Sequence, residues 1–248
     1  MKQGILIPVY NHGKTALPLT ERLAALGFPV ILVDDGSNEE TRGYLARAAA
    51  ASPLVSLVSL PKNRGKGGAV SAGIDTAHEL GLTHVLQIDA DGQHDETRIP
   101  FFLEQSRLRP DAVICGRPEF DASAPASRLN GRKITNTWCR IVSLSGDIID
   151  AMCGFRVYPV EPVRRLIHRT HFDQHMGFDI EILLRLSWEG TPLLYYPVPV
   201  RYPGDGLSNF HLVRDNARIT WLFTRLFFGM IFRLPMLLYR RKRKKAAA

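Results

Sequence analysis

Short apolar segments alternate with helix-length segments through residues 1–116, and this alternation narrows the folds that the chain can adopt. Each apolar segment is rich in Val, Ile and Leu and is bounded by turn residues, as buried strands are. Strands that are apolar along their whole length are buried on both faces, and helical crossovers between them produce a parallel sheet covered by helices. We therefore predict an α/β fold. The predicted strands are residues 4–9, 29–34, 54–60, 84–89 and 111–116, and the predicted helices are residues 14–26, 39–50, 67–80 and 97–107.

The rest of the chain has a looser pattern. It adds two predicted helices, residues 127–145 and 177–188, and two predicted strands, residues 148–157 and 193–202. No linker or repeat interrupts the chain before its C-terminal end. We therefore predict one domain over residues 1–210, followed by an amphipathic helix and a basic tail over residues 211–248.

Four polar segments each follow a predicted strand. In an open parallel sheet, ligands bind beyond the carboxyl ends of the strands, so four such segments predict a single site at one edge. The segments are PVYNH at 8–12, DDGS at 34–37, NRGKGG at 63–68 and DADGQHD at 89–95.

Asp89 and Asp91 carry the strongest indication of chemistry. Alternate residues of an extended segment point the same way, so both carboxylates can face one point. Two like charges this close are unfavourable unless a cation neutralises them, and oxygen ligands favour Mg²⁺ or Mn²⁺, which also hold phosphate oxygens. Gln93 and His94 could complete the coordination. The competing interpretation is a pair of solvated loop acids.

Two other polar segments allow both a binding and a structural interpretation. Asp34 and Asp35 could hold a ribose hydroxyl or a base edge, but the same segment could be an ordinary helix N-cap with Ser37. The glycines of 63–68 permit an anion to approach a helix N-terminus, although a glycine turn explains them equally well. The segment has neither P-loop nor GxGxxG spacing.

The charge of the chain is concentrated at its C-terminal end. The net charge is +8, and residues 201–248 alone hold eleven Lys or Arg against two Asp, which predicts an anionic partner. Arginines share one face of residues 211–248, and the longest apolar run has seven residues, short of the roughly 20 that span a bilayer. We predict a helix lying in the plane of an anionic membrane surface, with a helix packed on the body as the alternative. Nucleic acid is disfavoured because the basic run 240–245 lacks interleaved aromatic residues.

The cysteines indicate whether the protein works in a reducing or an oxidising compartment. Cys115, Cys139 and Cys153 form no CxxC pair, which argues against a disulfide scaffold or a zinc site and for a reducing environment. The first residues reach Pro, Asn and His before a long apolar run, unlike a signal peptide. We therefore predict a cytoplasmic protein, peripheral on the inner face of the cell membrane.

The ordered motifs PVYN, VDDGS, NRGKGGAV and DADGQH resemble those of the GT-A inverting glycosyltransferases of family two, in particular the polyprenyl (dolichyl) phosphate mannose or glucose synthases. Residues 150–156 (DAMCGFR) resemble the D-x-x-S-G-F-R box of that branch, with Cys153 in place of Ser. Residues 177–185 resemble its aromatic-x-x-E helix, and residues 206–209 (GLSN) its G-x-S-K element. The resemblance covers residues 4–210 and implies a GT-A (Rossmann-like), mostly parallel sheet flanked by helices. A bacterial subgroup without a multi-span C-terminal domain is most similar.

The resemblance implies inverting, metal-dependent transfer of a sugar from a UDP- or GDP-sugar to a lipid-linked acceptor, either a polyprenyl phosphate or a lipid hydroxyl. The implied nucleotide-sugar-binding residues are Pro8, Tyr10, Asn11, Asp34, Asp35, Lys66, Asp89, Ala90, Arg117, Arg128 and Arg201. The implied ligands of Mg²⁺ or Mn²⁺ are Asp89, Asp91 and Gln93. The implied catalytic residues are Asp179, Glu181, Asp150 and Arg156, with Asp179 the first candidate for a base and Asp150 and Arg156 on the sugar side.

The sequence departs from the family pattern at two positions and leaves two rival functions. His12 replaces the usual acid after PVYN, and Asn209 replaces the usual Lys. The Q-x-x-R-W element of processive synthases is absent, which argues against a polymerising enzyme. One rival is a nucleotidyltransferase, although the first loop lacks the expected G-x-G-T-R pattern. The other is a non-catalytic, membrane-docked sugar-nucleotide binder, which the intact DAD and CGFR segments disfavour.

Overall fold

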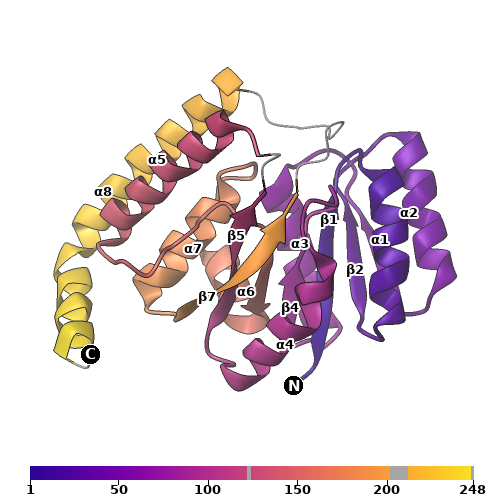
Figure 1. Cartoon of the computed structure of the whole chain (residues 1–248), viewed down its shortest axis with the longest axis horizontal. Helices are drawn as coiled ribbons and strands as arrows, with labels where there is room; N and C mark the ends of the chain where they lie inside the picture. The colour runs from indigo at the N-terminus through magenta and orange to yellow at the C-terminus, as the bar shows by residue number, and fades with distance from the viewer. Residues whose placement is uncertain (122–123, 202–211, 247–248) are drawn as a thin grey trace.

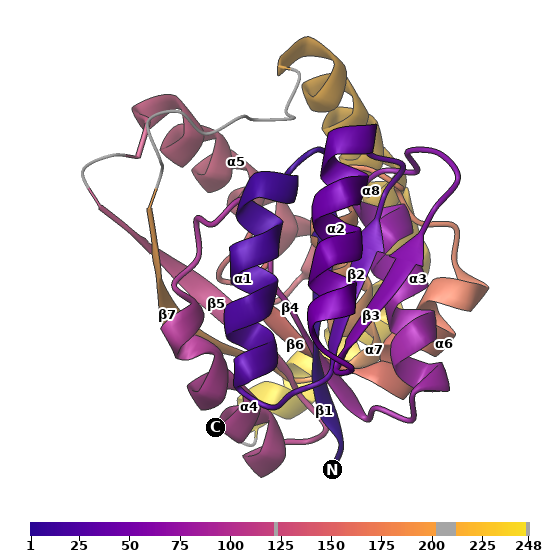
Figure 2. The same ribbon diagram turned by 90° about the vertical axis from the view of Figure 1, so that its right-hand side faces the viewer.

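The computed structural model describes residues 1–121, 124–201 and 212–246. Within them a seven-stranded sheet runs in the order β3-β2-β1-β4-β6-β5-β7 between two layers of helices (Figures 1 and 2). The strands are β1 Gln3–Val9, β2 Val30–Asp34, β3 Val55–Ser59, β4 His84–Gln87, β5 Val113–Phe120, β6 Arg156–Pro159 and β7 Leu193–Val200. The helices are α1 Gly13–Ala25, α2 Glu39–Ala51, α3 Lys66–Glu79, η1 Glu96–Arg98, α4 Ile99–Leu108, α5 Ala126–Ser143, α6 Val160–Arg169, α7 Phe178–Glu189 and α8 Leu212–Ala246.

Strand β1 shows why the sheet is buried on both faces. Ile5 and Ile7 join a core cluster with residues of α1, α2 and α4, whereas Leu6 joins a second cluster with residues of α3, α6 and α7. Alternate side chains of a strand point to opposite faces, so one apolar strand serves both layers. The predicted α/β fold with a mostly parallel sheet is confirmed.

The segment predicted as a strand over residues 148–157 is mostly a loop. Only its last two residues belong to β6, which runs antiparallel between β4 and β5. In the preceding loop the Asp150 carboxylate accepts hydrogen bonds from the backbone N–H groups of Met152 and Cys153, which are therefore not paired with a neighbouring strand. Helix α6 was not predicted. Its Pro162 lies in the first turn, where the missing N–H is not required.

Helix α8 packs against α5 and α7 and shares a core cluster with them. Leu222, Leu226 and Met230 are buried in this cluster. Among the described residues, α8 also contains one segment, Asp215–Arg243, that is long and apolar enough to cross a bilayer by length and composition. The apolar run of seven residues counted in the sequence did not indicate this property, because single arginines interrupt a segment whose mean hydropathy is nevertheless high.

Candidate active site

A cleft of about 650 Å³ opens at the carboxyl ends of β1, β2 and β4. All four polar segments contribute to its lining, as predicted. Two of these loops turn sharply at glycines with left-handed backbone, Gly36 (φ 68°) and Gly65 (φ 81°). A side chain at either position would be strained and would also collide with neighbouring backbone, so the loop geometry depends on glycine.

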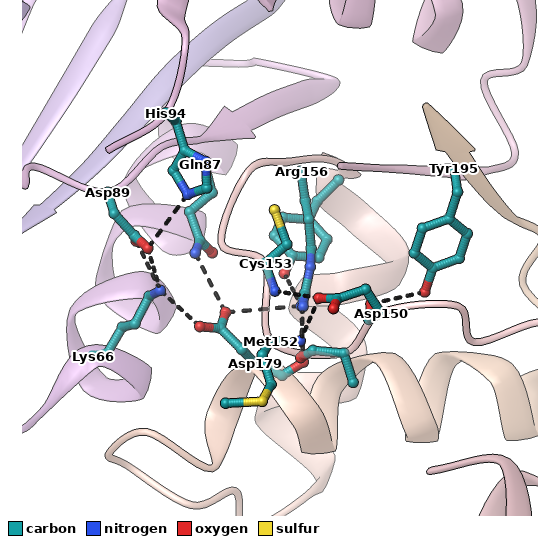
Figure 3. A network of polar contacts seen from close by, with 12 residues as sticks. Lys66, Gln87, Asp89, His94, Asp150, Met152, Cys153, Arg156, Asp179 and Tyr195 are labelled. Carbon is teal, nitrogen blue, oxygen red and sulfur yellow. Dashed lines mark hydrogen bonds and ion pairs between the residues drawn. The ribbon is translucent and has the colours of Figure 1, made fainter. Parts of the chain in front are cut away.

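Lys66 lies between two carboxylates at the floor of the cleft (Figure 3). Its Nζ atom is 2.7 Å from Asp89 Oδ1 and 2.7 Å from Asp179 Oδ2. Burial would lower the pKa of Lys66, but the charges of Asp179 and Asp89 raise it well above its ordinary value. Burial would raise the pKa of Asp89, but Lys66 and His94 bring it below the ordinary value. The structure therefore holds Lys66 as a cation and Asp89 as an anion.

Asp91 is the second acid of the DAD segment and lines the same cleft. Burial and the neighbouring charge of Asp89 raise the pKa of Asp91. The Asp91 carboxylate accepts a hydrogen bond from the backbone N–H of Gln93. His94 Nε2 is 4.0 Å from Asp89, and burial lowers the pKa of His94. A cation beside these acids would remove the repulsion between Asp89 and Asp91.

Asp179 is the first side chain of α7 to face the cleft. Besides Lys66, its carboxylate has Gln87 Nε2 at 3.4 Å and Arg156 Nη1 at 3.8 Å. Arg156 is fully buried and also donates hydrogen bonds to the carbonyl oxygens of Asp179 and Ala151. Arg156 thus lies beneath Asp179 and supports it, and it is not among the residues that line the cleft.

Asp150, predicted on the sugar side, organises its own loop instead. Its carboxylate lies 2.6 Å from Arg132 Nη1 and accepts further hydrogen bonds from Asn136 and from the Met152 and Cys153 backbone. These contacts bring the pKa of Asp150 below its ordinary value, although burial opposes the change. Asp150 does not line the cleft, and its contacts explain why an acid begins the DAMCGFR segment.

Glu181, the other acid of the GFDIE segment, faces away from the cleft. It is fully buried, and its carboxylate contacts Arg185 at 2.7 Å, Arg225 at 2.7 Å and the backbone N–H of Asp173. Residues two apart on a helix point in nearly opposite directions, so Asp179 and Glu181 cannot serve one site. Of these two acids, Asp179 is the one that lines the cleft.

The loop after β1 and the loop after β2 lie together at the other end of the cleft. Pro8, Tyr10 and Asp35 line it. The Asp35 carboxylate accepts a hydrogen bond from Arg64 N at 2.7 Å, and burial raises the pKa of Asp35. Asn11 has a left-handed backbone (φ 57°), and its side chain accepts a hydrogen bond from Asn38 N. Asn11 therefore joins the two loops without lining the cleft.

Several predicted binding residues fall outside the lining of the cleft. Asp34 accepts a hydrogen bond from Ser37 N and lies 3.8 Å from Arg42. The N-cap of α2 is Asn38, whose side chain accepts a hydrogen bond from Thr41 N, and not Ser37 as the alternative interpretation expected. Arg117 pairs with Glu119 at 3.6 Å on β5. Arg201 is exposed, and its backbone N–H donates to Gln93 O. The GLSN segment lies outside the described residues.

A family model described as glycosyl transferase family 2 matches residues 4–167, more than half of the chain. The chain belongs to glycosyl transferase family 2. The predicted family is therefore confirmed, and family membership disfavours the nucleotidyltransferase rival.

Relatives in this family include enzymes named for polyprenyl phosphates. The chain is 29% identical to a dolichyl-phosphate beta-glucosyltransferase of Trichomonas vaginalis, over 81% of this chain and 64% of that protein. It is 28% identical to an undecaprenyl-phosphate mannosyltransferase of Micrococcus luteus, over 80% of this chain and 83% of that protein. The chain spans slightly less than two thirds of the first of these relatives.

Solved family-like structures confirm the GT-A fold. A glucosyl-3-phosphoglycerate synthase from Mycobacterium tuberculosis, in complex with Mn²⁺, UDP-glucose and phosphoglyceric acid, superposes with a TM-score of 0.66 at 12% identity. That match covers 92% of this chain and 79% of the other. The S. aureus protein TarS in complex with UDP-GlcNAc gives a TM-score of 0.62 at 14% identity, over 96% of this chain and 72% of the other.

Sequence reasoning missed one wall of the cleft in this family member. Asp215, Arg218 and Ile219 come from α8, and His175 and Met176 from the turn before α7. Arg218 was noted only as part of a basic helical face, and no motif marks the other four. The positions of the three α8 residues depend on how α8 packs on the body, which the local sequence does not encode.

Proposed function

We propose that the chain transfers a sugar from a nucleotide-sugar donor to a polyprenyl phosphate, with inversion at the anomeric carbon and with Mg²⁺ or Mn²⁺. One observation carries the proposal. The cleft has an acidic floor, with Asp89, Asp91 and Asp179, and a wall that bears Arg128 and Arg218. Such a site suits a nucleoside diphosphate bound through a cation and a second anion bound by arginine.

The relatives support the choice of acceptor. The two described above are named for dolichyl phosphate and undecaprenyl phosphate, and a third, from Rhizobium johnstonii, is named dodecaprenyl-phosphate galacturonate synthase. A lipid hydroxyl is the alternative acceptor, and Asp179 is the observation that favours it. A phosphate is already ionised and needs no base, whereas a hydroxyl does.

The side chains fit a hard divalent ion. Asp89 and Asp91 are neighbouring carboxylates, and burial together with the charge of Asp89 raises the pKa of Asp91, while Gln93 adds an amide side chain to the same lining. The described residues contain no group of three His, Cys, Asp or Glu arranged to hold a metal. Mg²⁺ is commonly held by one or two carboxylates together with substrate phosphates, so Asp89, Asp91 and Gln93 would hold the ion. When bound, it would neutralise charge on the departing nucleoside diphosphate.

The remaining residues would bind the nucleoside of the donor or orient the carboxylates of the cleft. Asp35, Pro8 and Tyr10 would hold the nucleoside at one end of the cleft. Lys66 keeps Asp89 ionised and ties it to Asp179. Asp179 would accept the proton of a hydroxyl acceptor at its carboxylate. Arg156, buried beneath Asp179, is a positioning residue that fixes the direction of that carboxylate.

The decisive experiment measures product formed from UDP- and GDP-sugars with undecaprenyl phosphate in detergent, with and without Mn²⁺. We expect a lipid-linked sugar and release of nucleoside diphosphate, and we expect Asp91→Asn to lose at least about a hundredfold in turnover, as a removed electrostatic group does. Asp111→Asn is the matched control, because Asp111 pairs with Arg109 and is not among the residues that line the cleft. Pyrophosphate release would instead support a nucleotidyltransferase. Donor binding without any product would support a non-catalytic binder.

The chain would act at the cytoplasmic face of the cell membrane, attached peripherally. Its lipid acceptor would lie in the bilayer, and the basic end of the chain would favour an anionic leaflet. We propose a family domain over residues 1–210, followed by a membrane-contacting segment over residues 211–248.

A further inference from the structure

We propose that Lys66 competes with the divalent ion for Asp89 and gives way when the diphosphate of the donor binds, so that the ion binds tightly only together with the donor. This role of Lys66 rests on the proposed function, which supplies the divalent ion and the nucleoside diphosphate. It makes Lys66 a residue that sets the affinity for the ion, and not only a support for Asp89.

The ammonium group of Lys66 is bound to both oxygens of one carboxylate. Lys66 Nζ lies 2.7 Å from Asp89 Oδ1 and 2.9 Å from Asp89 Oδ2 (Figure 3). Because the two distances are nearly equal, the ammonium lies between the two oxygens. A divalent ion bound through Asp89 would use the same oxygens, and two cations a few ångströms apart repel each other strongly. Lys66 and the ion therefore compete for Asp89.

Lys66 has a second partner, which allows it to leave the first. Its Nζ atom lies 2.7 Å from Asp179 Oδ2. The Asp179 carboxylate is held in place by Gln87 Nε2 at 3.4 Å and by the buried Arg156 Nη1 at 3.8 Å. Lys66 can therefore release Asp89 while its charge remains paired with Asp179.

The start of α3 leaves the Lys66 side chain as the group that can meet a phosphate. The N–H groups of Gly67 and Gly68 both donate to the carbonyl oxygen of Gln174, at 2.8 Å and 3.3 Å. These two N–H groups are therefore not available to an anion, although the sequence allowed that use. Lys66 lines the cleft, and the flexible stem of a lysine lets its ammonium turn toward a new partner.

The charges of the cleft floor couple the ion to the donor. Lys66 forms ion pairs with Asp89 and Asp179, whereas the carboxylate of Asp91 accepts a hydrogen bond from the backbone N–H of Gln93. One ammonium thus serves two of three acids. A diphosphate in the cleft adds negative charge and gives Lys66 another partner, which frees Asp89 for the ion. Such coupling is reciprocal, so the ion also favours the donor.

Titration with Mn²⁺ in the absence of donor, followed by the electron paramagnetic resonance signal of the free ion, tests the competition. We expect Lys66→Met to bind Mn²⁺ at least about tenfold more tightly than the natural chain, because a competing cation is removed. UDP should raise the Mn²⁺ affinity of the natural chain by a larger factor than that of Lys66→Met. The matched control is Lys62→Met, an exposed lysine of the same loop outside the lining of the cleft, which should keep the natural affinity.

A purely supporting role for Lys66 predicts the opposite result. If Lys66 only holds Asp89 in place, Lys66→Met will bind Mn²⁺ more weakly than the natural chain or equally well, and either outcome would overturn the competition. Lys66→Arg keeps the charge and should show no increase in Mn²⁺ affinity. An increase in Lys66→Arg as large as that in Lys66→Met would mean that charge is not the cause.

Two carboxylates without their lysine could prevent folding, which circular dichroism detects. Lys66→Gln then replaces Lys66→Met in the titration, because its amide can still donate a hydrogen bond to one carboxylate although it carries no charge. We expect the same increase in Mn²⁺ affinity.

Failure of this inference and failure of the proposed function are distinguishable through Asp91→Asn. Loss of Mn²⁺ binding in Asp91→Asn, with no increase in Lys66→Met, would keep the ion in the proposed function and overturn the competition. Natural Mn²⁺ affinity in Asp91→Asn would remove the ion from the proposed site, and the competition with it. Product formation is measured independently of both titrations.

Discussion

At the scale of single residues, Gly154 is in contact with the charged floor of the cleft. A Cβ atom at this position would lie 2.5 Å from Asp89 Oδ2 and 2.7 Å from Lys66 Nζ. We expect Gly154→Ala to separate this ion pair and to lower turnover about a hundredfold, the size of effect that a displacement near 1 Å produces. Steady-state kinetics measures the turnover, and urea unfolding measures whether the variant keeps its stability.

The control for Gly154 is Gly146, which lies in the segment leading to the same loop and has open space around its Cα. Gly146→Ala should leave turnover unchanged. If Gly154→Ala also keeps the turnover of the natural chain, close packing against Asp89 and Lys66 is not required. The glycine of the GFR segment would then have another explanation.

Substitutions of Asp179 and of Glu181 should have different effects, although the two residues are only two positions apart in the sequence. Asp179→Asn should lower turnover at least tenfold with folding retained, because Asp179 faces the cleft and partners Lys66. Glu181→Gln should destabilise the fold by about 3 kcal/mol, because it leaves Arg185 and the partly exposed Arg225 uncompensated. Chemical denaturation and kinetics on both variants provide the check. If Glu181→Gln were as stable as the natural chain but had lost turnover, Glu181 and not Asp179 would be the residue required for activity.

The site could be predicted from the sequence where it depended on local order along the chain. Asp89, Asp91, Lys66 and Asp35 follow strand ends, and parallel strands bring their carboxyl ends to one edge. Asp150 and Arg156 belong to an equally recognisable segment, but their side chains support the site from below. A motif identifies residues that act together and does not show which of them face the ligand.

At the scale of elements, the contact between α3 and β1 depends on a small residue. A Cβ on Gly73 would collide with the Leu6 side chain, which is fully buried. We expect Gly73→Ala to destabilise the protein by about 1–3 kcal/mol through overpacking. Gly43→Ala on α2, where nothing lies within 4 Å, should instead stabilise it by about 0.5–1 kcal/mol. Urea unfolding of both variants compares them, and an equal effect would refute the packing argument.

Helices and strands could be predicted where the hydrophobic periodicity and the turn residues indicated the same boundaries. The first five strands and their helices follow from alternation, because each is bounded by glycine, proline or polar residues. β6 was misplaced since its four residues are antiparallel and follow a loop organised by Asp150. Such a loop depends on side-chain hydrogen bonds that hydrophobic periodicity does not report.

At the scale of the whole molecule, α8 shows the limit of sequence reasoning. Its amphipathic character was visible, and the arginines were interpreted as its polar face. In the structure, Arg225 and Arg233 contact Glu181 and Trp188 on α7, so part of that face is turned toward the body. Only the packing of α8 shows that it closes one wall of the cleft.

The stability of the whole fold should depend on pH through His84 at the start of β4. His84 Nε2 lies 3.0 Å from Pro110 O and Nδ1 lies 3.1 Å from Thr83 Oγ1, so the ring connects β4 to the segment before β5. Burial lowers the pKa of His84 in the fold, whereas the unfolded chain has a value of about 6.5. The unfolded state therefore binds more protons as pH falls through this range. The free energy of unfolding should decrease between about pH 8 and pH 5.5.

His84→Gln removes this titration while an amide can still donate to Pro110 O. We expect the variant to lose less free energy of unfolding than the natural chain over the same pH interval, measured by urea unfolding at both pH values. The comparison is internal, because every other titrating group is common to the two proteins. Parallel pH profiles would mean that His84 titrates alike in the folded and unfolded states, and that its burial at the start of β4 does not govern the acid sensitivity of the sheet.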